Sequence, residues 1–86
     1  MDIDIEYHKI NVKLGYFESL KSLYRIGNKV RGSIVAYGSK ETLKRRIEYV
    51  RNLLHSYGYS ITKYSKIKFS RIMSMYKIRI FFEKQL

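Results

Sequence analysis

Residues 39–58, SKETLKRRIEYVRNLLHSYG, are the stretch that decides the fold. Apolar side chains recur in this stretch at intervals of three and four residues, which is the repeat of one face of a helix. The apolar stripe consists of Leu43, Ile47, Val50, Leu54 and Tyr57. Ser39 is a good N-cap, and Gly58 can adopt the left-handed conformation that commonly ends helices. We therefore predict one amphipathic helix here.

The segment before this helix has the pattern of a buried strand. Val30–Gly38 contains the run Ile34-Val35-Ala36, in which successive residues are apolar rather than alternating with polar ones. Successive strand residues point to opposite faces of a sheet, so a continuous apolar run indicates burial on both faces. We predict a central strand over 30–38.

The N-terminal residues 2–7, DIDIEY, alternate acidic and apolar side chains. This repeat of two predicts a half-buried strand that ends near His8, where the alternation shifts by one residue. All three acids would then face one side, as they would in a metal-binding cluster. A solvent-facing strand edge is the interpretation that we favour, and no metal or other cofactor is expected.

Residues 12–26 fit two structures. Val12, Tyr16, Leu20 and Leu23 have helical spacing, whereas residues 12–14 alternate as in a strand. Gly15 would also cost a helix about 1 kcal/mol. We favour a helix over 12–26, ended by a turn at Gly27-Asn28.

The C-terminal residues predict a hairpin. Apolar side chains alternate with polar ones over 59–69 and again over 76–82, with a turn between Ser70 and Met75. The predicted element order is β-α-β-α-β-β. A single α+β domain follows, built as a two-layer sandwich with a mixed sheet, both helices on one face and a C-terminal β-hairpin.

The charge of the chain restricts its possible functions more than any sequence motif does. Eighteen Lys/Arg against seven Asp/Glu give a net charge of +11, and residues 59–86 alone hold seven cations against Glu83. A strand pair cannot bury so much charge, so it must face water or a polyanion. We therefore expect the C-terminal hairpin to stand clear of the rest of the domain, as an arm-like ribbon. Cysteine is absent, and neither a signal peptide nor a long apolar run is present, so a cytoplasmic protein is expected. No spacing of nucleophiles, bases or metal ligands predicts an enzyme.

The residues expected to bind nucleic acid fall into two groups. The first group is the cations of the predicted hairpin: Lys63, Lys66, Lys68, Arg71, Lys77 and Arg79. The second group lies at the predicted C-terminal ends of strands, where ligands tend to bind in α/β folds. It comprises His8, Lys9, Ser39 and Lys40. Ser39 can also act as a plain N-cap, and both roles are compatible.

The region Gly32–Lys84 resembles the Alba family of small archaeal chromatin and RNA-binding proteins. GSIVAYGSKETLKRRIEYVRNLL, starting at Gly32, is similar to the family's second strand, turn and second helix. ITKYSKIKF, starting at Ile61, and MYKIRIFFEK, starting at Met75, are similar to its closing hairpin. The resemblance implies a homodimer whose hairpins embrace a duplex, and a location on the nucleoid.

These observations predict a non-enzymatic protein that binds duplex DNA or structured RNA mainly through phosphates, as a dimer. The alternative is a small interaction protein, encoded for instance by a virus or plasmid, that binds an acidic host protein. Electrostatic steering would serve that role equally well.

Overall fold

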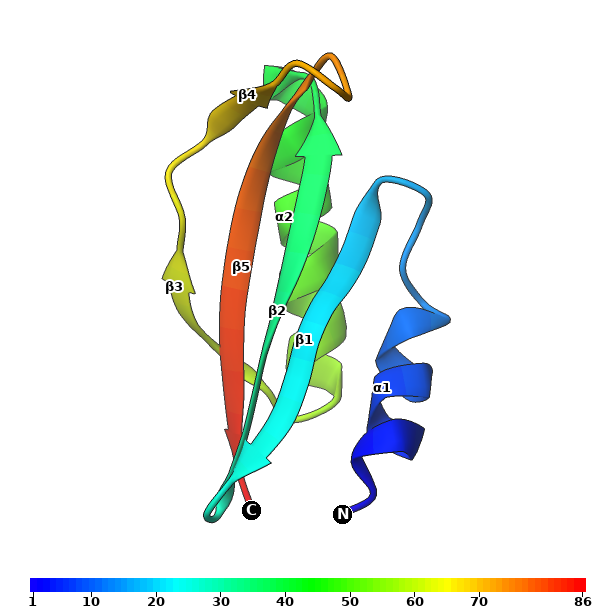
Figure 1. Ribbon diagram of the computed structural model, residues 1–86, viewed down its shortest axis with the longest axis vertical. Coiled ribbons are helices and arrows are strands. Elements are labelled where there is room, and N and C mark those ends of the chain that lie inside the picture. Colours follow the sequence, from blue (N-terminus) through cyan, green and yellow to red (C-terminus); the bar gives the residue numbers. More distant parts are fainter.

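The computed structural model describes residues 1–86 and contains two helices and a five-stranded sheet (Figure 1). In chain order, the elements are α1 (Ile3–Asn11), β1 (Glu18–Ile26), β2 (Lys29–Gly38), α2 (Lys40–Ser56), β3 (Ser60–Tyr64), β4 (Lys68–Ser70) and β5 (Met75–Gln85). The α+β class is therefore confirmed. The predicted order β-α-β-α-β-β is wrong over the first 28 residues, where a helix and a strand exchange places.

Every strand pair in the sheet is antiparallel. The strands lie in the order β1-β2-β5-β3, and the short strand β4 pairs with β5 beyond the end of β3. The prediction of a mixed sheet is wrong because β1 and β2 form a hairpin. Two parallel strands would have needed a helical crossover between them.

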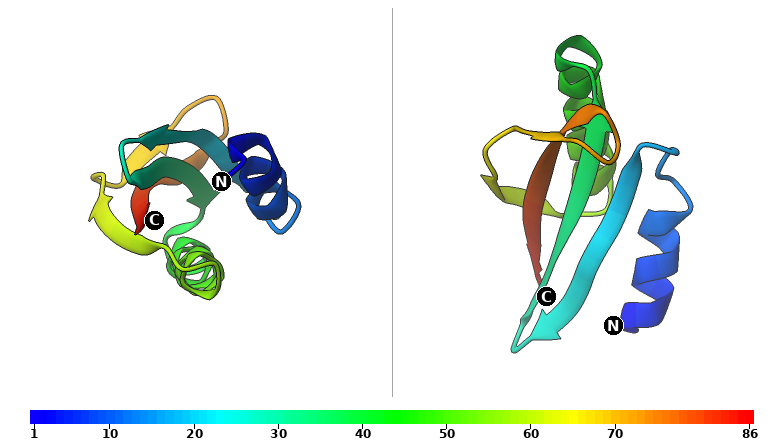
Figure 2. Two further views of the ribbon diagram at one scale, coloured as in Figure 1. Left: turned by 90° about the horizontal axis from the view of Figure 1, so that it is seen from below. Right: turned by 45° about the horizontal axis from the view of Figure 1, so that its top comes forward.

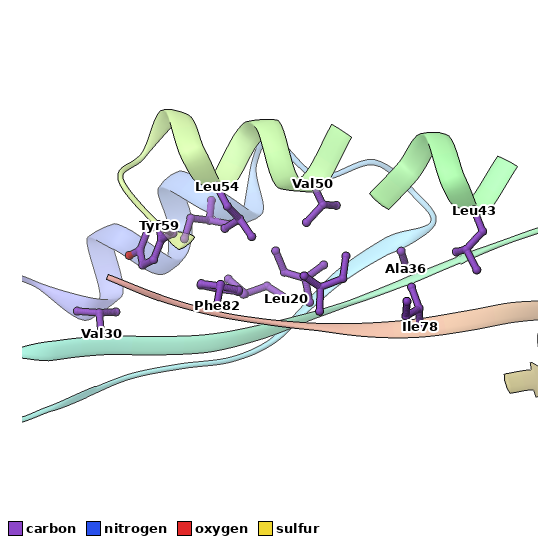
Figure 3. Close-up of a cluster of buried hydrophobic side chains, with 12 residues drawn as sticks. Leu20, Val30, Ala36, Leu43, Val50, Leu54, Tyr59, Ile78 and Phe82 are labelled. Carbon is purple, nitrogen blue, oxygen red and sulfur yellow. The ribbon is translucent and has the colours of Figure 1, made fainter. Parts of the chain in front are cut away.

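Both helices contribute to a single core on one face of the sheet. Figure 3 shows α2 side chains above the inward side chains of the central strands, with α1 on the same side. The buried cluster consists of Ile10, Leu20, Val30, Ile34, Ala36, Leu43, Val50, Leu54, Tyr59, Ile78, Ile80 and Phe82. The predicted two-layer arrangement with helices on one face is confirmed, and the opposite face of the sheet carries no helix (Figure 2).

Helix α2 has the boundaries and the inward face that its sequence predicts. The Ser39 side chain accepts a hydrogen bond from the Thr42 amide at 3.1 Å, and the Thr42 hydroxyl accepts one from the Ser39 amide at 2.9 Å. This reciprocal capping box satisfies amides that have no partner inside the helix. Gly58 follows the helix with a φ of 85°, which non-glycine residues rarely adopt.

The predicted N-terminal strand is wrong, because residues 3–11 form α1. Asp2 caps this helix, its carboxylate accepting hydrogen bonds from the amides of Asp4 and Ile5 at 2.9 and 3.3 Å. The inward residues are Ile3, Glu6 and Ile10, at intervals of three and four. The acids therefore do not share a face: Asp2 and Asp4 are exposed, while Glu6 is buried.

Glu6 joins α1 to the C-terminal half of the chain. Its Oε1 atom accepts a hydrogen bond from the Tyr59 hydroxyl at 2.8 Å and lies 3.4 Å from Lys84 Nζ. Lys84 Nζ also donates to the Tyr57 carbonyl at 2.9 Å. A buried carboxylate without such partners would be strongly destabilising, so α1 can dock only once these distant residues are in place.

This cluster predicts a loss of stability at alkaline pH. Burial raises the pKa of Tyr59 above its ordinary value of 10.0, and the hydrogen bond to Glu6 raises the pKa further. Above about pH 10 the unfolded chain releases this proton while the native protein retains it, so stability falls with pH by at most about 1.4 kcal/mol per unit. Subtracting the unfolding free energy of Tyr59→Phe from that of the wild type at each pH isolates the effect. A difference that stays flat from pH 9 to 11 would contradict it.

The predicted helix over 12–26 is also wrong, because β1 occupies Glu18–Ile26. The register of β1 against β2 shifts between Leu20 and Ser22. A bulge of this kind reverses the alternation of side chains along a strand. It turns both Leu20 and Leu23 toward the core, three residues apart as on a helix. Gly27, with a φ of 59°, then forms the two-residue hairpin turn with Asn28.

The C-terminal strands are antiparallel as predicted, but they do not form a separate arm. β5 pairs with β2 along its length and with β3 and β4 on its other side (Figure 1). It is therefore an interior strand of the sheet. The resemblance to the Alba family, which rests on Gly32–Lys84, stays a hypothesis.

Candidate nucleic-acid interface

The face of the sheet opposite α2, called the open face below, has small side chains at its floor. Ser22 and Ser33 lie side by side on β1 and β2, with their hydroxyl oxygens 2.9 Å apart. Val35 follows on β2, opposite Arg79 of β5. Long side chains on the neighbouring strands rise around this floor and leave two hollows.

The first hollow, called the basic hollow, has a volume of about 370 Å³ and holds five cations and no carboxylate. The cations are Lys21, Lys66, Lys68, Lys77 and Arg79. Backbone pairing fixes their positions: Lys68 lies opposite Lys77, and the Arg79 amide donates to Ser65 Oγ at 2.8 Å. The last contact holds the connection that carries Lys66 against β5.

The second hollow, called the aromatic hollow, has a volume of about 390 Å³ and lies nearer the β1–β2 turn. Tyr24 and Phe81 line it, together with Arg31 and Glu83. Lys63 Nζ lies 5.8 Å from the centre of the Phe81 ring. The hollow therefore combines aromatic surfaces with cationic hydrogen-bond donors and a single carboxylate.

Glu83 is the only carboxylate along the two hollows, which together hold seven cations. It forms ion pairs with Arg31 and Lys29, at 3.2 and 3.8 Å. None of the five cations of the basic hollow lies within 4.0 Å of a carboxylate. Crowding like charges on one face raises the free energy of the isolated protein, and a bound polyanion would lower it.

Five of the six hairpin cations expected to bind nucleic acid come together on the open face. Lys63, Lys66, Lys68, Lys77 and Arg79 are exposed there, on or between β3, β4 and β5. Arg71 is exposed in the turn that follows β4. The structure thus brings these residues onto one surface, although that surface is a sheet and not a projecting ribbon.

The second predicted group does not join them. His8 and Lys9 lie on α1, so their placement in a loop at a strand end is wrong, and Lys9 Nζ lies 4.5 Å from the centre of the Tyr57 ring. Ser39 does follow a strand end, where it serves as the N-cap of α2. Lys40 Nζ lies 5.3 Å from the centre of the Tyr76 ring, at the same end of the sheet.

The capping role of Ser39 can be separated from a role in binding. Ser39→Ala removes the oxygen that accepts from the Thr42 amide, so the free energy of unfolding should fall by about 1 kcal/mol. Affinity for nucleic acid should stay within twofold of the wild type. Chemical denaturation and a binding titration check the two effects. An unchanged stability with a large loss of affinity would instead assign Ser39 to the interface.

Two cations of the open face were not expected from the sequence, Lys21 and Arg31. The assignment of residues 12–26 to a helix concealed Lys21. Arg31 could have been found, because in a strand over 30–38 it alternates with Val30 and Gly32 and therefore points away from the core.

Comparison of the chain with models of known families, with curated proteins and with solved structures finds no match. No helix is both long and apolar enough to cross a membrane. No group of three or more His, Cys, Asp or Glu side chains is arranged to hold a metal ion.

Proposed function

We propose that this chain is a non-enzymatic nucleic-acid-binding protein, which binds duplex DNA or structured RNA through the phosphates on the open face of its sheet. The observation that carries the proposal is the basic hollow, with five cations and no carboxylate within ion-pair distance. Cations that merely solubilise a surface are usually interspersed with acids. The α2 surface is of this mixed kind, because Arg51 Nη2 lies 2.6 Å from Glu48 Oε1.

The length of the molecule and the spacing of its strand residues suit a duplex. The molecule is 37 Å long, which corresponds to about 11 base pairs at the 3.4 Å rise of B-DNA. Residues of one face along a strand, such as Lys77 and Arg79, repeat at about 6.8 Å, close to two base-pair steps. A regular row of phosphates can therefore meet successive cations without distortion of the sheet.

The test is a titration against duplex DNA, duplex RNA and single strands of 16 nucleotides at 50 and 200 mM salt. Five phosphate contacts predict an affinity for duplex DNA that falls about 500-fold over this range. Affinity that does not change with salt would refute the proposal. Capture of an acidic protein that resists nuclease treatment, with no affinity for any nucleic acid, would favour the alternative interaction protein.

Dimerisation is part of the proposal. Asp2 and Asp4 are exposed in a stretch, residues 1–8, that holds no Lys or Arg, so two copies of a +11 protein can approach here with less repulsion than through the open face. Met1, Ile5 and Val12 are exposed there, although they are apolar. Sedimentation equilibrium at 5 to 200 μM protein checks the state, and a constant monomer mass across this range would remove the dimer from the proposal.

A further inference from the structure

The turn between β4 and β5 exposes apolar side chains at one end of the open face. Ile72 is 96% exposed and Met73 38% exposed. Phe69, on the adjoining strand, pairs with Tyr76 and therefore faces the α2 side of the sheet instead. Single exposed apolar residues are ordinary, whereas two adjacent ones that project from a turn can form a contact surface. We call Ile72 and Met73 the apolar tip.

The turn that carries the tip has a fixed shape. Its ends are held by the pairing of Ser70 with Met75, and the Met73 amide donates to Ser70 Oγ at 3.3 Å. Ser74 has a φ of 53°, in the left-handed region that non-glycine residues occupy at some cost. The Phe69 and Tyr76 rings pack edge to face below the turn, with centroids 5.3 Å apart. A partner would therefore meet a preorganised protrusion.

The tip projects on the side that carries the basic hollow. Figure 2 (left) shows this turn, in orange, rising from the sheet on the side opposite α2. Arg71 precedes Ile72 directly, and Lys68 and Lys77 pair across the strands at the base of the turn. A polyanion lying along the open face would thus run into the tip at its end.

This arrangement distinguishes two kinds of partner. A tip that enters a lipid surface needs cations gathered around the tip, since only that end touches the membrane. Here the cations continue away from the tip, through Arg79 to Lys63 at the aromatic hollow. A row of cations that ends in an apolar protrusion is complementary to duplex DNA. The phosphates would contact the cations, and apolar side chains can insert between base pairs from the minor groove.

We propose that Ile72 and Met73 act as a wedge that enters the minor groove of DNA, unstacks one base step and bends the duplex lying on the open face. The inference rests on the proposed function and narrows its ligand to DNA, because the minor groove of A-form RNA is wide and shallow. Flexible pyrimidine–purine steps, such as TA, would be the favoured points of entry.

The experiment measures bending and affinity separately. A 20-base-pair DNA with one central TA step carries a donor and an acceptor dye at its ends, and 2-aminopurine at the step reports unstacking. The wild type should raise both energy transfer and 2-aminopurine fluorescence. The double variant Ile72→Ser, Met73→Ser should lose both signals and about tenfold in affinity. Its salt dependence should match that of the wild type, since no cation is removed.

A matched control removes an exposed apolar side chain at the other end of the sheet. Ile26 adjoins the β1–β2 turn and is also exposed, so Ile26→Ser should leave bending unchanged. Wild-type binding to a straight duplex, with no effect of the tip variant, would overturn the wedge and leave the proposed function standing. No binding of any duplex at 50 mM salt would overturn both. Tip-dependent binding to phosphatidylserine vesicles without DNA bending would overturn the wedge in favour of a lipid surface.

Discussion

Removing four cations from the basic hollow is expected to abolish binding to duplex DNA at physiological salt while the fold stays intact. The variant carries alanine at Lys66, Lys68, Lys77 and Arg79. Each phosphate contact contributes about 0.9 to the slope of log affinity against log salt, so the slope should fall by about 3.6. All four side chains are exposed and none is in an ion pair, so the melting temperature should stay the same or rise. Fluorescence anisotropy and thermal denaturation measure the two quantities.

The control removes the same charge from elsewhere. Alanine at Lys13, Arg25, Lys44 and Arg45 also lowers the net charge by four, and these residues are exposed outside the two hollows. This variant should keep most of its affinity, because only long-range attraction is weakened. Equal losses in both variants would mean that net charge, and not the open face, governs binding. Unfolding of the first variant would assign its cations a structural role.

Phe82→Ala is expected to remove a large part of the stability of the domain. The Phe82 side chain is 1% exposed and its ring packs edge to face on Tyr59, with centroids 5.1 Å apart. Truncating a buried Phe costs about 3–5 kcal/mol, whereas a domain of this length has roughly 4–13 kcal/mol in total. Urea denaturation followed by circular dichroism should therefore show a transition at much lower urea, or no folded baseline.

The neighbouring residue provides the control. Phe81 precedes Phe82 on β5 but points to the open face, where it lines the aromatic hollow. Phe81→Ala should cost about 1 kcal/mol or less, because its ring is only partly buried. The pair tests the interior position of β5: in a projecting hairpin neither substitution would unfold the domain. A small effect of Phe82→Ala would contradict the sheet order.

Local patterns predicted the second half of the chain well. In 39–58 the apolar repeat, the capping serine and the terminal glycine agree with one another, and α2 has these limits. The antiparallel strands after it also followed from alternation. The alternation of side chains does not show which strands pair with each other, and β2 pairs with β5, some forty residues further along the chain. The sequence therefore predicts a projecting ribbon, whereas β5 is an interior strand of the sheet.

The predictions for the first half of the chain are wrong for two identifiable reasons. In α1 an inward position is occupied by Glu6, which breaks the apolar repeat of the helix and leaves the alternation of residues 2–7 as the stronger signal. Its burial depends on Tyr59 and Lys84, which lie 53 and 78 positions away. In β1 the bulge mimics helical spacing. Gly27-Asn28 was nevertheless a usable hairpin signal, since Gly-Asn is a common two-residue turn between strands.

The candidate interface was predicted in part. The excess of cations after residue 59 pointed to five of the cations that the structure gathers on the open face. Lys21 and Arg31 join them only through the pairing of β1 with β2 and of β2 with β5. His8 and Lys9 were expected at the end of an N-terminal strand, but they lie on α1. The wrong secondary structure therefore also gave a wrong position for these two candidate site residues.

The interior position of β5 affects how the protein folds during its synthesis on the ribosome. β5 is the only strand that pairs with both β2 and β3, and it is the last of the five strands in chain order. While residues 75–85 remain inside the exit tunnel, β2 and α2 can meet only as an incomplete layer with one unpaired edge, which is prone to self-association. The sheet is therefore expected to form only after residues 75–85 have emerged, and a translational pause before Met75 should increase capture of the nascent chain by chaperones.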